Sequence, residues 1–483
     1  MTADAGLATR VITRCGAMLA LSGALAGCAG IPDLGPKPQA HTLAQLQSAR
    51  SLPGAGQAWA AQQWWKRYGD DQLDQMMDEA LANSPDLATA QARLLKAEGY
   101  AQAAGASLLP SADLNLSSTR LKQSYNNGAP KALAPQGFNS ASRAALDFSY
   151  EIDFWGKNRD LLAAATSELE AARAETAQSR LMLTSAIAAG YAQLASLHAD
   201  RDAAEKAVQV RRDSLQLLKD RQWHGLETLG SVEQAQSRRA AAEADLIAAD
   251  EAIALQRNSL AALLGAGPDR GLAIHRPAVD LSRPQALPAT LQAELISRRP
   301  DLTSARLRVE AAAKRINVAR AGFFPNVNLT AYVGGQSLGA IDLLTKSGSG
   351  IAGIGPAINL PIFRGGQLQG EYRAARADYD AAVASYNQTL IQALREVADA
   401  VTRQRTLEPQ LWQRQAALES AEEAYRVAND RYRGGLANYL TVLNAEDSVI
   451  DTRRTLTDLQ SQQFMQDIAL IKALGGGYRD ASI

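Results

Sequence analysis

The sequence contains few of the residues that catalytic and metal centres commonly use. Its 483 residues include two cysteines and four histidines, and aromatic residues make up 5%. The histidines are scattered without the spacing of metal ligands: His41, His198, His224 and His275. Basic and acidic residues balance at 50 each, so the chain lacks the basic field that attracts nucleic acid. We therefore expect no metal, no other bound cofactor and no nucleic-acid partner.

Long apolar runs are also lacking, which limits how the chain could cross a membrane. A spanning helix needs about 20 predominantly apolar residues, and even the run around Met18 is shorter than that. If the protein crosses a membrane, it must therefore do so with strands, because helices and closed sheets are the only structures that satisfy their backbone groups in lipid.

The N-terminus has the features of an export signal. Arg10 and Arg14 precede a short apolar segment, and the small residues Ala26 and Gly27 lead directly to Cys28. This order resembles the bacterial lipobox, in which the cysteine thiol takes a diacylglycerol and becomes the first residue. We predict a signal peptide at 1–27 and a lipid on Cys28, the alternative being ordinary cleavage with an incidental thiol. Cys15 would leave with the signal, so no internal disulfide could form.

The remainder is a duplicated unit with a period of roughly 210 residues. Pro300-Asp301-Leu302 repeats Pro85-Asp86-Leu87, and Gly435-Leu436 repeats Gly225-Leu226. A period of this length indicates a copied domain and not a solenoid. We predict the following division: a lipidated linker at 28–66, a first repeat at 67–265, a Pro- and Gly-bearing linker at 266–288, a second repeat at 289–477 and a C-terminal tail at 478–483.

Both repeats show the same order of helical and strand patterns. A helix begins after the Pro-Asp pair, and two stretches of alternating polar and apolar residues then predict a β-hairpin. These stretches are 112–117 and 146–154 in the first repeat, then 327–333 and 354–362 in the second. Residues 126–128 and 347–350 are the predicted hairpin loops.

Long helical runs follow each predicted hairpin, at 157–222 and 367–431. Five leucines of the first run share one heptad phase, which predicts a coiled-coil seam: Leu162, Leu169, Leu183, Leu197 and Leu218. A shorter helix, about Val232 to Leu264, returns from the first run. Pro409 is expected to bend or interrupt the second run.

Polar residues on one strand face and apolar residues on the other have two interpretations. The usual one is a half-buried sheet of a soluble domain. The export signal, and the lack of another apolar element to cover that face, favour transmembrane strands instead. Four strands are too few to close, and lipid does not tolerate open edges, so several chains would have to share one barrel.

At this point the sequence resembles the TolC-like outer-membrane efflux proteins, most closely the lipoprotein branch that includes OprM and NodT. The resemblance covers nearly the whole mature chain, and its motifs lie at 65–70, 299–302, 431–443 and 472–477. It implies an α+β fold of long coiled-coil helices and β-hairpins. In a homotrimer, the hairpins would form a 12-stranded outer-membrane β-barrel, continued by a periplasmic α-helical tunnel.

The same resemblance implies a function. The chain would be the exit duct of a tripartite efflux pump, passing drugs, metal ions or other solutes outward. Its partners would be a periplasmic adaptor and an inner-membrane transporter, for which we expect the proton-driven RND type. The competing hypotheses are a periplasm-spanning structural coiled-coil lipoprotein without channel activity, and an exported hydrolase. No catalytic motif and no phosphate-binding loop supports an enzyme.

The resemblance also assigns roles to residues at the turns between long and short helices. It places Leu440, Asn444, Arg431 and Ser231 at a periplasmic aperture. It makes six turn residues the adaptor docking surface: His224, Gly225, Leu226, Gly434, Gly435 and Leu436. The family normally carries acids at the positions of Asn444 and Ser231, so we expect little contribution from a carboxylate ring. Asn444 could instead pack between helices, and the glycines could serve only the turns.

Overall fold

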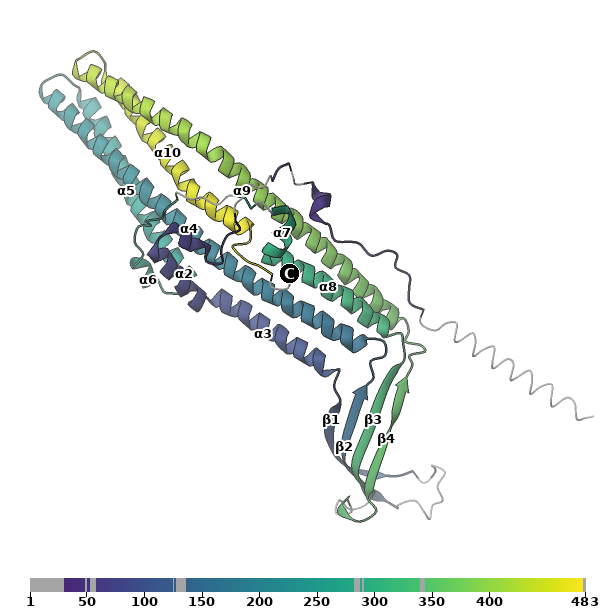
Figure 1. The fold of residues 1–483 in the computed structure, drawn as a ribbon. Helices are drawn as coiled ribbons and strands as arrows, with labels where there is room; N and C mark the ends of the chain where they lie inside the picture. The colour runs from purple at the N-terminus through teal and green to yellow at the C-terminus, as the bar shows by residue number, and fades with distance from the viewer. Residues whose placement is uncertain are drawn as a thin grey trace, which may run out of the picture. The chain divides into compact units, whose positions relative to one another are not determined.

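A computed structural model describes most of the chain (Figure 1). The described residues are 30–47, 50–52, 58–124, 126, 136–281, 287–288, 291–338 and 344–480, with only the backbone described at 291–293. The predicted signal peptide, Cys28 and the predicted loop residues Asn127 and Gly128 lie outside these ranges.

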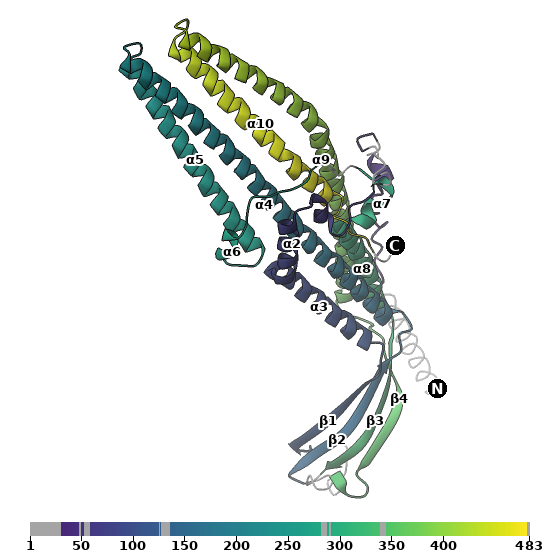
Figure 2. The ribbon, with the colours of Figure 1, turned by 60° about the vertical axis from the view of Figure 1, so that its left-hand side comes forward.

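Two pairs of helices with equal lengths dominate the fold, which confirms the predicted duplication. Helices α4 (Lys157–Trp223) and α9 (Gln367–Arg433) have 67 residues each. Helices α5 (Leu229–Leu263) and α10 (Tyr439–Ala473) have 35 residues each. In both views α5 lies beside α4 and α10 lies beside α9, so each pair forms a helical hairpin (Figures 1 and 2).

Two helix predictions need correction. Helix α5 begins at Leu229, three residues before the predicted start, because the Thr228 side chain caps it. Of the two outcomes expected at Pro409, the interruption is wrong, because α9 continues to Arg433. The helix is curved along its length, as Figure 2 shows. Proline has no backbone N–H to donate to the carbonyl four residues earlier. Because Pro409 is exposed, that carbonyl can bond to water while the rest of the helix is retained.

The shorter helices complete the repeats. Helices α3 (Pro85–Ala106) and α8 (Pro300–Ala321) have 22 residues each and carry an aspartate in the first turn. They begin at the proline of the Pro-Asp pair, slightly earlier than the predicted start after that pair. The others are α2 (Asp71–Asn83), α6 (Asp269–Leu272), α7 (Leu291–Arg298), and the 3₁₀ helices η1 (Leu43–Leu46) and η2 (Trp64–Tyr68).

The predicted hairpins form one antiparallel sheet with the order β1-β2-β3-β4. Its strands are β1 (Ser111–Lys122), β2 (Phe138–Glu151), β3 (Asn326–Leu338) and β4 (Gly350–Asn359). Pairing of β2 with β3 joins the two repeats. Strands β2 and β4 end three residues earlier than predicted. After β2 the chain turns into α4, where the Asp153 carboxylate accepts a bond from the backbone amide of Arg159.

The strand register places the apolar residues on one face of the sheet. Phe148 of β2 lies opposite Ala112 of β1 and Ala331 of β3. The other face is polar, and there the Asn115 amide donates to Asp147 over 2.8 Å. Two-sided sheets of this kind suit a boundary between lipid and water.

The described chain divides into two compact units that cut across the repeats. The first comprises the N-terminal segment up to Gln39 together with Leu95–Ala171 and Arg306–Ser385, and includes the sheet. The second comprises the remaining residues and includes α5, α10 and the ends of α4 and α9 that they accompany.

Aromatic residues form much of the core of the second unit. Trp64 and Trp65 of η2 are buried with ring centroids 5.8 Å apart. The buried Tyr68 hydroxyl donates to Asp467 of α10 over 2.6 Å. The Tyr191 hydroxyl of α4 donates to Asp70 over 2.8 Å. These bonds tie the segment before α2 to long helices from both repeats.

Candidate functional site at the helical tips

The two helical hairpins end in turns with the same geometry. Gly225 and Gly435 have φ angles of 73° and 74°, the left-handed region that favours glycine. The Leu226 amide donates to the Arg221 backbone carbonyl over 2.9 Å, and the Leu436 amide donates to the Arg431 backbone carbonyl over 2.8 Å. Both turns therefore satisfy the last carbonyls of α4 and α9 in the manner of a Schellman cap.

Each turn leads into a helix with a capped N-terminus. The Thr228 hydroxyl accepts a bond from the Ser231 amide over 3.2 Å, and the Asn438 amide oxygen accepts one from the Thr441 amide over 3.1 Å. Ser231, an expected aperture residue, also donates its hydroxyl to Glu227 over 2.9 Å. The Ser231 hydroxyl is therefore hydrogen-bonded within the tip of its own hairpin.

Leu440 and Asn444 lie one turn apart on α10, and both are exposed in the single chain. Leu440 is 56% exposed, whereas the adjacent Tyr439 is buried. Leu443, beside Asn444, is also buried. The start of α10 thus buries one side and presents Leu440 and Asn444 on the other, as residues spaced i and i+4 should.

Arg431 lies at the end of α9 and is exposed. Within the described residues its side chain forms no hydrogen bond or ion pair, and its backbone carbonyl caps the turn. His224 lies in the other turn, with ring Nδ1 2.7 Å from the Asp220 carbonyl. The Gly434 amide donates to the backbone carbonyl of Asp430 over 3.0 Å.

The polar connection between the two tips involves residues that the sequence did not single out. The Tyr432 hydroxyl of α9 donates to Glu227 over 2.6 Å, and Glu227 belongs to the turn between α4 and α5. The Arg221 guanidinium lies over the Tyr432 ring, 4.5 Å from its centroid, a cation–π contact. This interaction occurs once per chain, because the repeat equivalents of Tyr432 and Glu227 are Gln222 and Ala437.

Hydrogen bonding holds Glu227 in its ionised form. Burial alone would raise the pKa of Glu227. The bonds from Tyr432, the Thr228 amide and Ser231 outweigh that effect, so the pKa lies below the usual 4.5. Burial, followed by the neighbouring Glu227 carboxylate, raises the pKa of Tyr432, so its hydroxyl remains a donor at neutral pH.

A second polar cluster, which we call the inter-hairpin network, lies farther from the turns. Arg211 of α4 is largely buried and pairs with Glu446 of α10 over 2.8 Å. It also contacts Asp447, which receives a 2.6 Å bond from Arg238 of α5. The Ser214 hydroxyl donates to Glu446 over 2.7 Å. The network therefore links α10 to both helices of the first hairpin.

Burial makes the inter-hairpin network depend on its pairing. Burial raises the pKa of Glu446, and Arg211 opposes this rise by favouring the carboxylate. For the more exposed Asp447, the bonds from Arg211 and Arg238 outweigh burial and lower the pKa. The repeat equivalents of all four charged residues are neutral: Ala421, Gln236, Ser237 and Ser448. A comparison of the repeats could therefore have detected the network.

Apolar residues fill the space around these polar contacts. The cluster draws on all four helices and comprises Leu215, Leu218, Val232, Ala235, Ala428, Tyr432, Tyr439, Val442 and Leu443. Leu226 and Leu436, at the turns themselves, remain 64% and 74% exposed. The tips thus combine a packed interior with apolar ends that are free in the single chain.

Two features are absent from the described residues. None of their helices combines the length and apolar character that crossing a membrane requires. Their side chains also contain no group of three or more His, Cys, Asp or Glu residues arranged to hold a metal ion.

Comparison with known proteins identifies the class. A profile of the family "Outer membrane efflux protein" matches residues 76–266 and 291–476. The multidrug resistance outer membrane protein MdtP of Escherichia coli is 32% identical over 475 residues, covering 95% of each chain. The toluene efflux pump outer membrane protein TtgF of Pseudomonas putida is 31% identical, covering 96% of this chain and 97% of the relative.

A solved structure agrees with this assignment. The outer membrane protein VceC of Vibrio cholerae superposes with a TM-score of 0.83 at 45% identity, covering 87% of this chain and 100% of VceC. The fold and its paired helical tips are those of an outer-membrane efflux channel. The chain belongs to the outer membrane efflux protein family, and its place is the outer membrane.

Proposed function

We propose that three copies of this chain form the exit duct of a tripartite efflux pump. The observation that carries this proposal is the sheet: one face is apolar, and among the described residues β1 and β4 each pair with only one neighbour. Lipid cannot satisfy two open edges, so the strands of several chains must join. Three chains supply 12 strands, an even number as in bacterial single-chain barrels, and their helices would continue the duct on the periplasmic side.

The periplasmic end would be narrowed by rings of Leu440 and Asn444. Both residues lie on the exposed side of α10, and three-fold symmetry would stack them as two rings one turn apart. Asn444 is neutral and can both donate and accept hydrogen bonds, whereas an aspartate ring would repel itself. Arg431, whose guanidinium has no partner within the described residues, would tie neighbouring chains, while Ser231 would support the tip through Glu227.

The turns of both hairpins would form the docking surface for a periplasmic adaptor. Leu226 and Leu436 are exposed at equivalent positions, and the two glycine turns fix them there. His224, Gly225, Gly434 and Gly435 complete the surface. Both turns need glycine, because a Cβ at either left-handed position would strain the turn. This role in the turn is compatible with a role in docking.

The transporter at the inner membrane would supply the energy, and we propose one of the proton-driven RND type. The names of relatives refer to multidrug resistance and to toluene efflux. We infer that this duct likewise passes drugs or other small solutes and itself has no enzymatic activity. The transporter would contain the specific substrate pocket.

Cys28 would anchor the protein through covalent lipid, because Ala26 and Gly27 provide a processing site directly before it. Mass spectrometry of the mature N-terminus tests this proposal. Diacylglycerol on Cys28 would support it, and an unmodified thiol would exclude it without affecting the channel proposal.

Channel activity is tested by reconstitution in planar bilayers. We expect stepwise conductance from a detergent-resistant species with the mass of three chains. A stable monomer that spans the periplasm without conductance would favour the structural coiled-coil lipoprotein instead.

A further inference from the structure

A cavity of about 250 Å³ lies where the sheet joins the helices of the first unit. Three chain segments line it, those leading from β2 to α4, from α8 to β3 and from β4 to α9. All of its lining residues are described. Because the apolar face of the sheet faces lipid in an outer-membrane channel, this end of the strands marks the level of the membrane surface.

Aromatic residues border the cavity. Trp155 stacks on Phe324 with ring centroids 4.6 Å apart, and its indole Nε1 donates to the Pro325 carbonyl over 2.8 Å. Trp155 nevertheless remains 51% exposed, and the neighbouring Phe154 and Phe363 are 63% and 84% exposed. Indole rings of this kind favour the head-group level, where one part is apolar and the other can form hydrogen bonds.

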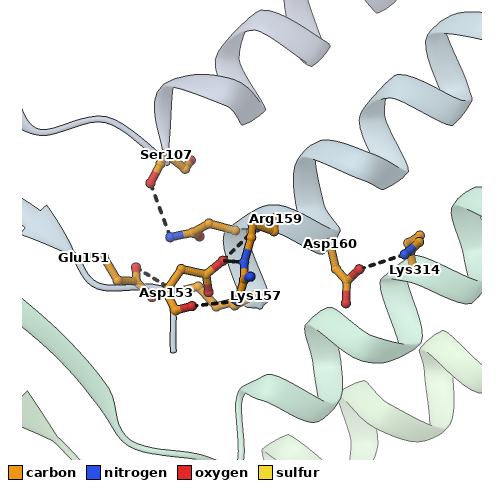
Figure 3. Close-up of polar contacts among 8 residues, drawn as sticks. Ser107, Glu151, Asp153, Lys157, Arg159, Asp160 and Lys314 are labelled. Atoms are coloured by element: carbon orange, nitrogen blue, oxygen red, sulfur yellow. Dashed lines mark hydrogen bonds and ion pairs between the residues drawn. The ribbon is translucent and has the colours of Figure 1, made fainter. Parts of the chain in front are cut away.

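Most charges near the cavity are already neutralised within the chain (Figure 3). Three ion pairs surround the first turn of α4: Glu151 with Lys157 at 2.6 Å, Asp153 with Arg159 at 3.3 Å, and Asp160 with Lys314 at 3.1 Å. The charged lining residues Glu151, Asp153 and Lys157 therefore have partners. A ligand would have to be recognised by other groups.

Two charges in the lining have no oppositely charged partner in the part of the chain that the structure describes. Arg364, after β4, is exposed, and its guanidinium forms no hydrogen bond or ion pair within the described residues. Glu371 of α9 accepts a 2.7 Å bond from the neutral Gln367 amide but pairs with no cation in that part of the chain. Among the described residues, the cavity therefore offers one unpaired cation, Arg364, and one unpaired anion, Glu371, beside an exposed aromatic border.

We propose that this cavity binds the head group of a zwitterionic phospholipid with a primary ammonium group. Arg364 would bind the phosphate, since a guanidinium presents several donors to phosphate oxygens. Glu371 would accept hydrogen bonds from the ammonium. The acyl chains would lie along Phe154, Phe363 and the apolar sheet face, a surface that a free phosphate ion would leave uncovered.

Native mass spectrometry of the full-length assembly tests the proposal. The detergent-solubilised protein is mixed with equal amounts of phosphatidylethanolamine, phosphatidylglycerol or phosphatidylcholine. The detergent is then removed, and the lipid that stays bound to the protein is measured. We expect phosphatidylethanolamine to be retained best, because only its head group combines phosphate with a hydrogen-bonding ammonium. Arg364→Gln should weaken its retention about tenfold or more, the usual effect of losing a charge-assisted hydrogen bond. Arg364→Lys should restore part of it.

The second variant separates the two head-group contacts. Glu371→Gln should reduce the retention of phosphatidylethanolamine to that of phosphatidylglycerol and leave phosphatidylglycerol unchanged. Arg373→Gln is the matched control, because Arg373 is also exposed on α9 and has no partner in the described residues. It should behave like the unaltered protein.

Three results would overturn the proposal. Equal losses in Arg364→Gln and Arg373→Gln would indicate non-specific attraction to lipid phosphates. Equal retention of the three lipids by the unaltered protein would exclude recognition of the ammonium group. Displacement of the lipid by millimolar inorganic phosphate would identify a site for a free anion.

Discussion

The Tyr432 hydroxyl lies 2.6 Å from the Glu227 carboxylate and joins the tips of two helical hairpins that originate from different repeats. Since Glu227 has a lowered pKa, the stability from this bond is fully present above the unfolded value of 4.5 and is lost as the pH falls through the lower folded value. The connection between the tips is therefore intact from about pH 5 to neutral pH.

Removal of the Tyr432 hydroxyl should loosen the tips. We expect Tyr432→Phe to cost about 1 kcal/mol or more, because Glu227 loses a charge-assisted bond while the ring and its contact with Arg221 remain. The closed channel should then open more often in bilayer recordings. Gln222→Ala, at the equivalent position of the first repeat, is the control and should leave the open probability unchanged.

The inter-hairpin network should respond asymmetrically to single and double substitutions. Arg211→Met leaves the buried Glu446 carboxylate without its main partner and should destabilise the folded chain by about 3–5 kcal/mol. The double variant Arg211→Met with Glu446→Leu should recover most of that loss. Denaturant unfolding of the purified protein measures both effects, and equal destabilisation by both variants would contradict the pairing.

The proposed aperture predicts different effects for its two rings. Leu440→Ala should raise the conductance of the closed channel more than Asn444→Ala, because loss of an exposed isobutyl group removes an apolar barrier. Conductance should depend only weakly on pH between about 5 and 7, since Asn444 does not titrate and Glu227 remains ionised. Strong periplasmic block by divalent cations, with no change in Leu440→Ala, would contradict this gate.

Asp200 of α4 should make stability depend on pH. Burial, then the charge and hydrogen bond of Asp458 on α10, raise the pKa of Asp200 to about 6, against a smaller opposing effect of Arg454. A raised carboxyl pKa gives stability that is complete below the unfolded value of 3.8 and lost as the pH rises through about 6. Asp245 of α5 lines the same cavity as Asp200 and Arg454 and adds to the negative charge there.

Asp200→Asn should remove this dependence. One pKa unit corresponds to about 1.4 kcal/mol, and solvent screening of a partly exposed group reduces the expected gain at pH 7 to about 1 kcal/mol. Thermal unfolding at pH 5 and pH 7 would measure it. Unfolding temperatures that show the same pH dependence in the variant and the unaltered chain would assign the dependence to other groups.

Local sequence patterns predicted the helices and strands well because strong periodicity carried them. The long run from Lys157 was predicted to end at Gln222, one residue before its observed end. Alternation around Phe148 predicted the apolar sheet face that the register now shows. Strand ends were less accurate, since alternation continues through Phe154 although the backbone already turns toward α4.

The contacts between the hairpins could not be predicted in the same way. Tyr432 with Glu227, and Arg211 with Glu446, are each separated by more than 200 positions, and no local period links them. The family resemblance predicted a role for Arg431, whereas its neighbour Tyr432 forms the hydrogen bond to Glu227 that joins the two tips within the chain. Differences between the repeats carried the missing signal, because paired charges occur where the other copy is neutral.

The equal lengths of the twin helices have a consequence for how such a chain can change in evolution. Insertion of seven residues into α4 alone would displace its turn by about 10 Å relative to the turn of α9. The Tyr432–Glu227 bond would then be impossible, and Leu226 and Leu436 would no longer present one level surface. Changes of length must therefore occur in both copies together. The lengths of α4 and α9 jointly determine how far the two tips extend.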